Sequence, residues 1–291
     1  MATKIILFCE GTNSSIDRKI LLKICPPDGE RTVVPLGGKY GSPAFIDGYR
    51  SKGNVLSAEA EAVIQPKFIC LRDRDFDFAI QPDHIPRLLE RPDRVNGARD
   101  IYIYATYRAA MENYLLSPGL LAQFLKKDKQ EVGEIVLESA RSIAHYSAMR
   151  HALGKLRQKF DFGTTWMLNG SGHLPATEVL ASEERCFEKG WSLVSNFRTE
   201  TDAITRDALR EHFEHFQNLF STPDFWKTHR YLAYFHGKDL QKSVGRTFAQ
   251  SGTRSLGSWD EFHEFAIKNT DFTAFDDLRA FKELVENIQG K

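Results

Sequence analysis

The sequence predicts an α/β domain with a mainly parallel sheet, followed by a helical region. Up to about residue 115, short apolar runs alternate with segments of helical spacing, which is the pattern of parallel strands joined by helices. From about residue 112 onward, the apolar residues recur at helical spacing only. We therefore predict an α/β domain over residues 1–120 and an α-helical domain over residues 121–291.

Short apolar runs mark the expected strands of the first domain. Runs of this kind are typical of strands that are buried on both faces of a sheet. They lie at residues 5–9, 32–36, 68–71 and 101–104. Pro35 cannot donate a hydrogen bond to a neighbouring strand, so we expect it near a strand end or on a sheet edge. The helices expected between the strands lie at residues 16–24, 44–49 and 58–63.

The second domain is expected to consist of helices joined by loops. Apolar residues at helical spacing predict one long or broken helix over residues 129–160. The Gly/Ser-rich segment at residues 163–175 is expected to be a loop. Further helices are predicted at residues 176–190, 202–220, 223–250, 258–268 and 275–288.

The charge balance limits how this chain can contact nucleic acid. Its 39 basic residues equal its 39 acidic residues, whereas a sequence-tolerant nucleic-acid coat is normally strongly basic. Contact with nucleic acid would therefore require a local basic patch, or metal ions that bridge acidic residues to phosphate.

The cysteines and the hydropathy pattern indicate a soluble, cytoplasmic protein that does not contact a membrane. No two of the four cysteines have CxxC spacing, so we expect reduced thiols in the core. The first residues lack the pattern of a signal peptide. No apolar run approaches the roughly 20 residues that a membrane-spanning helix needs.

Acidic residues follow two of the predicted strands. Glu10 comes directly after the first strand, and Asp73 and Asp75 come just after the third. Carboxyl ends of parallel strands meet at one sheet edge, and in an extended chain residues two apart point the same way. Clustered carboxylates repel one another, and a hard cation such as Mg²⁺ relieves that repulsion. Acid-rich turns after strands are also common as solvated loops. The prediction therefore depends on acidic residues following both the first and the third strand.

Four motifs, in this order along the chain, resemble those of TOPRIM proteins, most closely the DUF4435 group of OLD-like nucleases. They are Glu10-Gly11, a V-x-P-x-G-G element at 33–38, DRDFD at 73–77 and ENYLL at 112–116. The later Gly237-Lys238 resembles part of the family's C-terminal helical region. The resemblance covers residues 4–120 well and the remainder loosely. It implies a Rossmann-like TOPRIM domain in which a carboxylate cluster binds Mg²⁺, with Mn²⁺ as an alternative, and cuts phosphodiester bonds.

Size and layout are similar to the TOPRIM effector subunits of PARIS anti-phage systems. This resemblance implies an RNase toxin that cuts host tRNA. It also implies an ABC-type ATPase partner that holds the effector inactive, and a homodimer when the effector is active. No motif in the chain establishes the partner or the substrate independently.

The acidic site residues have expected roles and simpler alternatives. Asp73 and Asp75 would ligate the cation, with Glu10 as a further ligand or as the base for the attacking water. Glu112 would complete the site, or it is an acid at a helix N-terminus. Asp17 and Asp77 would support these ligands from nearby, or they are ordinary acidic residues of a helix and a turn.

Basic residues near these motifs are candidates for phosphate contacts. Lys39, Arg72 and Arg74 could bind phosphate, or the arginines could form local ion pairs with the neighbouring acids. Lys238 and Lys242 lie in the basic segment 227–254. The aromatic residues of that segment could stack on unpaired bases, or they are core residues of a solvated helix. They are Tyr231, Tyr234 and Phe235.

Two other functional classes remain open. A D-x-D sequence after a strand also occurs in metal-dependent glycosyltransferases, but this assignment gives Glu10 and the segment 112–116 no role. A TOPRIM domain can also act without catalysis, as a regulatory or binding subunit.

Overall fold

The computed structural model describes most of the chain and divides it into two compact units. The sheet unit comprises residues 1–73, 81–107 and 269–291, and the helical unit comprises residues 74–80 and 108–268. These units differ from the expected division near residue 120, because 108–120 belongs to the helical unit and the C-terminal segment belongs to the sheet unit. The described residues are 5–37, 67–76, 88–89, 101–157, 177–196, 205–251 and 257–290.

Several expectations lie outside the described residues. They are the helices at 44–49 and 58–63, the loop at 163–175, and the site candidates Lys39 and Asp77. Within the described segments, no helix has the length and apolar character that crossing a membrane would require.

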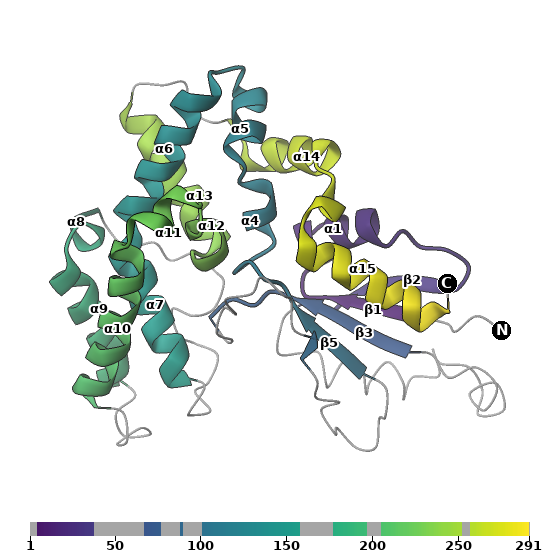
Figure 1. Ribbon diagram of the computed structural model, residues 1–291, viewed down its shortest axis with the longest axis horizontal. Helices are drawn as coiled ribbons and strands as arrows, with labels where there is room; N and C mark the ends of the chain where they lie inside the picture. Colours follow the sequence, from purple (N-terminus) through teal and green to yellow (C-terminus); the bar gives the residue numbers. More distant parts are fainter. Residues whose placement is uncertain are drawn as a thin grey trace. The chain divides into compact units, whose positions relative to one another are not determined.

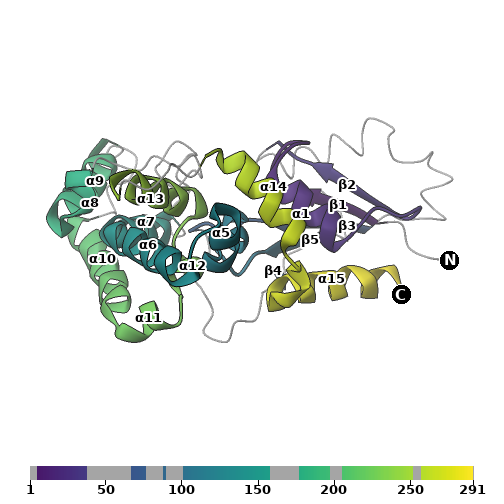
Figure 2. The same cartoon turned by 90° about the horizontal axis from the view of Figure 1, so that it is seen from above.

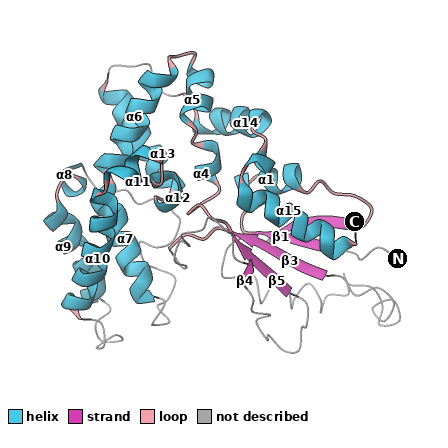
Figure 3. Ribbon diagram, in the orientation of Figure 1, coloured by secondary structure: helices cyan, strands magenta, loops and turns pink. Residues whose placement is uncertain are grey.

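The sheet unit contains a sheet of five strands in the order β2-β1-β3-β5-β4 (Figures 1 and 3). Four of them are parallel, which confirms the predicted α/β class with a mainly parallel sheet. The two-residue β4, which the sequence did not predict, pairs antiparallel with β5. The strands are β1 (Ile5–Cys9), β2 (Arg31–Pro35), β3 (Lys67–Arg72), β4 (Leu88–Leu89) and β5 (Ile101–Ala105).

The strand order creates a switch point between β1 and β3. From β1 the chain passes to β2 on one side, whereas β3 pairs with the other side of β1. Pro35 is the last residue of β2, which is an edge strand, as its missing N–H requires. In open α/β sheets, ligands bind outside the carboxyl ends of the strands at such a switch point.

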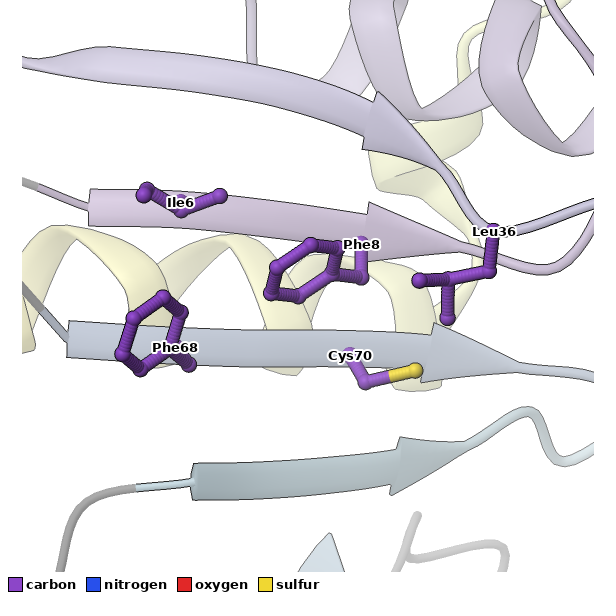
Figure 4. Packing of buried hydrophobic residues seen from close by; sticks show 5 residues of the cluster. All are labelled: Ile6, Phe8, Leu36, Phe68 and Cys70. Carbon is purple, nitrogen blue, oxygen red and sulfur yellow. The ribbon is translucent and has the colours of Figure 1, made fainter. Parts of the chain in front are cut away.

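Both faces of the central strands β1 and β3 are buried. On one face lie α1 (Ile16–Ile24) and α15 (Asp276–Gln289), and the Tyr104 hydroxyl donates to the Asp277 carbonyl oxygen at 2.9 Å. Figure 4 shows the other face, where the Phe8 and Phe68 rings stack with their centroids 5.9 Å apart. Burying a phenylalanine contributes about 1.5–3 kcal/mol, so this apolar pattern stabilises the strands. A short 3₁₀ helix, η3 (Phe272–Ala274), precedes α15.

The helical unit is built from eleven elements in the described residues. Within it α9 and α10 pack on α7, while α5 and α13 pack on α6 (Figures 1 and 2). The helices are α4 (Glu112–Leu115), α5 (Pro118–Leu125), α6 (Lys129–Ser142), α7 (Ala144–Arg157), α8 (Thr177–Leu180), α9 (Glu183–Asn196), α10 (Arg206–Ser221), α11 (Pro223–Lys227), α12 (Tyr231–Tyr234), α13 (Gly237–Gln250) and α14 (Trp259–Asn269).

Three predicted helices are interrupted. The helix expected over 176–190 divides into α8 and α9. The helix expected over 129–160 breaks at Ile143, which ends α6 before α7 begins. The helix expected over 223–250 is three helices, because His229 has a positive φ of 55° between α11 and α12, and Phe235 is extended before α13. Helical spacing alone does not reveal such single-residue breaks.

Candidate active site

Glu10 lies at the switch point of the sheet and pairs with an arginine. Phe8 is in register with Cys70, so the residues two further along, Glu10 and Arg72, emerge side by side on the same face. The Glu10 Oε1 atom lies 3.7 Å from Arg72 Nε, and both side chains are about one-sixth exposed, 16% and 17%. Of the two roles considered for Arg72, the structure therefore shows the local ion pair.

Gly11 and Asp17 shape the turn that follows Glu10. A Cβ atom at Gly11 would lie 2.1 Å from Ser15 Oγ and 2.7 Å from Asp17 Oδ2, so only glycine fits there. Ser15 caps α1 by accepting from the Arg18 N–H at 3.3 Å. Burial, followed by the charge of Asp17, raises the pKa of the Cys9 thiol to about 12, so the Asp17 carboxylate acts on the end of β1.

The four cysteines are buried, free thiols, as predicted. Burial raises the pKa of Cys25, Cys70 and Cys186 to about 12, as for Cys9, so these thiols stay protonated at neutral pH. They supply neither a nucleophile nor a soft metal ligand.

Asp73 and Asp75 do not share the geometry that the sequence suggested. Half-buried Asp73 follows β3 in the sheet unit, whereas Asp75 belongs to the helical unit. Asp75 has a positive φ of 47°, so the chain is not extended there and the expected two-residue alternation is wrong. Asp75 is 5% exposed, and its Oδ1 atom lies 3.3 Å from His236 Nε2.

Arg74 has a structural contact within the helical unit. Its side chain is buried, and Nη2 donates to the Ala233 carbonyl oxygen at 2.7 Å. This contact is not the exposed phosphate contact that the sequence suggested.

Glu112 is the first residue of α4. It therefore has the position expected of an acid at a helix N-terminus, which was the simpler of the two roles considered for it. Its Oε1 atom lies 3.5 Å from Lys238 Nζ, and the Lys238 side chain is half exposed. A Cβ atom at Gly237 would lie only 2.7 Å from Glu112 Cβ, so the glycine permits the close approach. The motifs at 112–116 and 237–238, far apart in sequence, are thus neighbours.

The aromatic residues of the basic segment do not face solvent. Tyr231, Tyr234 and Phe235 are buried in the helical unit, so the expectation that they stack on bases is wrong and their core role is confirmed. The basic residues differ, because Lys238 and Lys242 are exposed and Arg246 is half-buried. These three residues recur every four positions along α13 and therefore lie on one side of the helix.

Sequence reasoning missed a buried charged pair, Arg150 with Asp239. Arg150 Nη1 donates to Asp239 Oδ2, and both side chains are almost fully buried. Burial alone would lower the pKa of Arg150, but the charges of Asp239, Tyr146 and Asp75 and the hydrogen bond with Asp239 together outweigh burial and raise it. The Arg150 guanidinium also lies over the Phe76 ring, 4.3 Å from its centroid. No local pattern reveals a pair whose members are 89 residues apart.

His151 is a second buried group that sequence reasoning treated only as a helix position. Burial, followed by the charge of Arg74, holds the pKa of His151 well below its usual range. The neutral ring donates from Nε2 to the Tyr234 carbonyl oxygen at 3.0 Å. Its ring stacks on Phe216 with centroids 4.5 Å apart.

The described acids at the strand ends do not form a closed metal site. In the part of the chain that the structure describes, no three His, Cys, Asp or Glu side chains gather closely enough to hold a metal ion. A closed cage of three carboxylates is therefore not formed there. Mg²⁺ typically takes one or two carboxylates and completes its shell with water and substrate phosphates. Glu10 and Asp73 follow the neighbouring strands β1 and β3, and they are the carboxylates that such an arrangement would use.

Neither a scan against protein-family models nor a search of curated proteins gives a match to this chain.

Proposed function

We propose that this chain is a Mg²⁺-dependent phosphodiester hydrolase of the TOPRIM type that acts on nucleic acid. One observation carries the proposal. Glu10 and Asp73 follow β1 and β3, the parallel neighbours between which the strand order changes direction. This is where an open α/β sheet binds its ligands, and carboxylates are the ligands that Mg²⁺ prefers.

The residues at this edge have separable roles in the proposed reaction. A bound Mg²⁺ would polarise the phosphoryl group and lower the pKa of attacking water. Glu10 and Asp73 would hold it. Arg72, already 3.7 Å from Glu10, balances the charge of that carboxylate and can turn to a phosphate oxygen. Asp17 would support the site from the first turn of α1.

Substrate and partners follow from the resemblance rather than from contacts in this chain. We propose an RNase toxin that cuts tRNA, is held inactive by an ABC-type ATPase, and is active as a homodimer. Lys238 and Lys242, exposed on α13, would contact the phosphate backbone. The zero net charge makes such a local patch necessary.

A non-catalytic TOPRIM regulatory subunit is the second candidate. It is favoured by the ion pair of Glu10 with Arg72 and by the burial of Asp75 against His236, since both acids already contact protein cations or donors. A glycosyltransferase has no such support, because the turn at Asp75 removes the extended D-x-D geometry.

Cleavage of a tRNA mixture by the purified chain distinguishes these candidates. We expect Mg²⁺-dependent cleavage that Glu10→Gln and Asp73→Asn each reduce on the order of 10³-fold, because a metal centre supplies several kcal/mol of transition-state stabilisation. Asp276→Asn is the control, since Asp276 is an exposed acid of the same unit that pairs with surface Arg279. Full cleavage by both site variants would contradict the proposal. A wild-type chain without cleavage that still binds tRNA would favour the regulatory subunit.

A further inference from the structure

Three buried polar atoms of the helical unit lack hydrogen bonds that they require. They are Arg150 Nε and Nη2 and Asp239 Oδ1, none of which has a hydrogen-bond partner among the described residues. The two side chains are only 1% and 2% exposed, so bulk solvent does not reach these atoms. In folded proteins the large majority of buried polar atoms are hydrogen-bonded, either to protein or to ordered water. These three atoms therefore require a partner that the described side chains do not supply.

The two arginine atoms point toward the same place. Arg150 contacts Asp239 through Nη1, which leaves Nε and Nη2. In a planar guanidinium the N–H groups of Nε and Nη2 form a fixed fork that suits an oxygen acceptor. The Phe76 ring, whose centroid lies 4.3 Å from the guanidinium carbon, attracts the cation with its face but provides no oxygen for this fork. The fork of Arg150 therefore requires an oxygen atom beside its contact with Asp239.

The start of α13 provides two acceptors that require donors. His236 is the N-cap residue of this helix, and Asp239 lies in its first turn. His236 Nε2 lies 3.3 Å from Asp75 Oδ1, which favours the tautomer with its proton on Nε2 and leaves Nδ1 as an acceptor. Like Asp239 Oδ1, His236 Nδ1 is buried and has no hydrogen-bond partner in the described part of the chain. Helix α7 thus presents two donors, and the start of α13 presents two acceptors.

The charges around Arg150 exclude an ion as the shared partner. The guanidinium is paired with the carboxylate of Asp239 and is also affected by the charge of Asp75. A bound anion would be buried beside these two carboxylates, whereas a bound cation would face the N–H donors of Arg150. Burying a charge without a favourable partner costs much free energy. The partner must therefore be a neutral molecule that accepts from nitrogen and donates to oxygen.

Water has both capacities and fits the number of groups. A buried water molecule typically makes about 3 hydrogen bonds to polar groups that have no other partner. Arg150 Nε and Nη2 can donate to its oxygen, and Asp239 Oδ1 can accept from one of its hydrogens. The second hydrogen is available to a further acceptor at the start of α13, such as His236 Nδ1.

We propose that a buried water molecule is bound between Arg150 and Asp239 as an integral part of the helical unit. It joins α7 to the first turn of α13 and completes the hydrogen bonding of a charged pair that is buried away from solvent. The exposed Lys238 lies in the same helical turn as Asp239, so the water also holds the start of the helix that presents this lysine. This inference does not depend on the proposed function.

A crystal structure of the full chain, at a resolution that shows ordered water, tests the assignment directly. We expect a water oxygen within hydrogen-bonding distance of Asp239 Oδ1 and of the Nε or Nη2 atom of Arg150. The proposal would be overturned by an anion or a protein atom in that place. A direct two-point contact of Arg150 with Asp239, or no density beside the pair, would overturn it equally.

A variant tests the same assignment in solution. In Arg150→Met with Asp239→Leu both partners become apolar, so no unpaired charge is buried and the chain is expected to fold. Magnetic relaxation dispersion of water deuterium counts the long-lived buried waters of each protein. We expect the count to be lower by one in the double variant than in the wild-type chain.

Gln241 and His263 provide the matched control. They form another buried pair of the same unit, with Gln241 Nε2 at 2.7 Å from His263 Nε2. Neither side chain has an unpartnered buried atom in the described segments. Gln241→Leu with His263→Leu should therefore leave the count of buried waters unchanged. A count that stays the same in Arg150→Met with Asp239→Leu, or that falls equally in this control, would contradict the proposed water site.

Discussion

The two units each contain an arginine–carboxylate pair, and the pairs differ in burial. In the sheet unit Arg72 and Glu10 are 3.7 Å apart and partly exposed. In the helical unit Arg150 and Asp239 are in contact and buried, with 1% and 2% of their side chains exposed. Removing one partner of a buried pair costs about 3–5 kcal/mol. Exposure to solvent weakens an ion pair, so we expect the partly exposed Arg72–Glu10 pair to contribute less.

This difference assigns different tasks to the two units. A cation or a phosphate can displace Arg72 from Glu10 at little cost, so the strand ends can exchange ligands. The charges of the helical unit cannot be exchanged in this way, and they fix the turn around Asp75 instead. The sheet unit therefore holds Glu10 and Asp73, the residues proposed for chemistry, and the helical unit holds a buried polar cluster around Asp75.

The largest expected effect tests this contrast directly. Arg150→Ala should lower the free energy of unfolding by about 3–5 kcal/mol, because Asp239 would be left as a buried, uncompensated charge. Arg72→Ala should lower it by less, because the Arg72 and Glu10 side chains are partly exposed and their charged atoms are 3.7 Å apart. Urea unfolding of both variants, followed by circular dichroism, measures the two losses.

The double variant Arg150→Met with Asp239→Leu serves as the control for this comparison. Replacing both charges by apolar groups should recover most of the stability lost in Arg150→Ala, because no unpaired charge remains. Equal losses in Arg150→Ala and Arg72→Ala would show that the two pairs do not differ as their burial suggests.

A glycine substitution tests the rigidity of the turn around Asp75 and Phe76. In Gly154→Ala the new Cβ would meet the Phe76 carbonyl oxygen at 2.5 Å, which is backbone and cannot rotate away. We expect a loss of about 1–3 kcal/mol, as for other overpacked sites. Gly133→Ala in α6 is the matched control, since its nearest neighbour is Pro118 Cβ at 3.9 Å, and we expect it to stabilise by about 0.5–1 kcal/mol. A harmless Gly154→Ala would mean that the turn around Phe76 can shift.

The buried His151 of the helical unit predicts that the unfolding free energy depends on pH. Its pKa in the folded chain lies well below the ordinary value, near 6.5, that the unfolded chain has. Above about pH 6.5 neither state binds the proton, and below it only the unfolded state does. Unfolding free energy should therefore fall by about 1.4 kcal/mol per pH unit below pH 6.5, until the folded pKa is reached.

His151→Phe should remove this part of the pH dependence. The variant starts from a lower stability, since the Tyr234 carbonyl oxygen loses its donor. Chemical unfolding at pH 7.5, 6.5 and 5.5 compares the two slopes. An identical loss between pH 6.5 and 5.5 in the variant would show that His151 is not the responsible group.

The sequence predicted the sheet unit better than the helical unit, for a physical reason. Strands β1, β3 and β5 and helix α1 are determined by local apolar runs and by the N-cap Ser15. The place of Glu10 after β1 follows from the same local pattern. Strand order is not a local property, so the switch point appeared only in the structure.

The site residues of the helical unit could not be predicted in this way. The left-handed turn at Asp75 is imposed by contacts with Ala109 and His236, which lie far along the chain. The basic aromatic segment had two interpretations with identical spacing, and only burial separates them. Tyr231, Tyr234 and Phe235 have the i, i+3, i+4 spacing of a core face, which was the better indication.

The smallest expected effect concerns the exposed charges of α13. Lys238→Glu and Lys242→Glu should each reduce the salt dependence of tRNA binding by about one unit of slope in a plot of log K against log salt, if each lysine contacts one phosphate. Both side chains reach solvent, so we expect little change in stability for Lys242→Glu and a modest loss for Lys238→Glu, because Lys238 also pairs with Glu112.

Lys282→Glu on α15 is the matched control from the sheet unit, where the lysine pairs with Glu286 at 3.8 Å. Fluorescence anisotropy with labelled tRNA at several salt concentrations measures the slopes. If Lys282→Glu changes the slope as much as the α13 variants do, the phosphate contacts are not confined to the helical unit, and the division of tasks between the two units fails at this point.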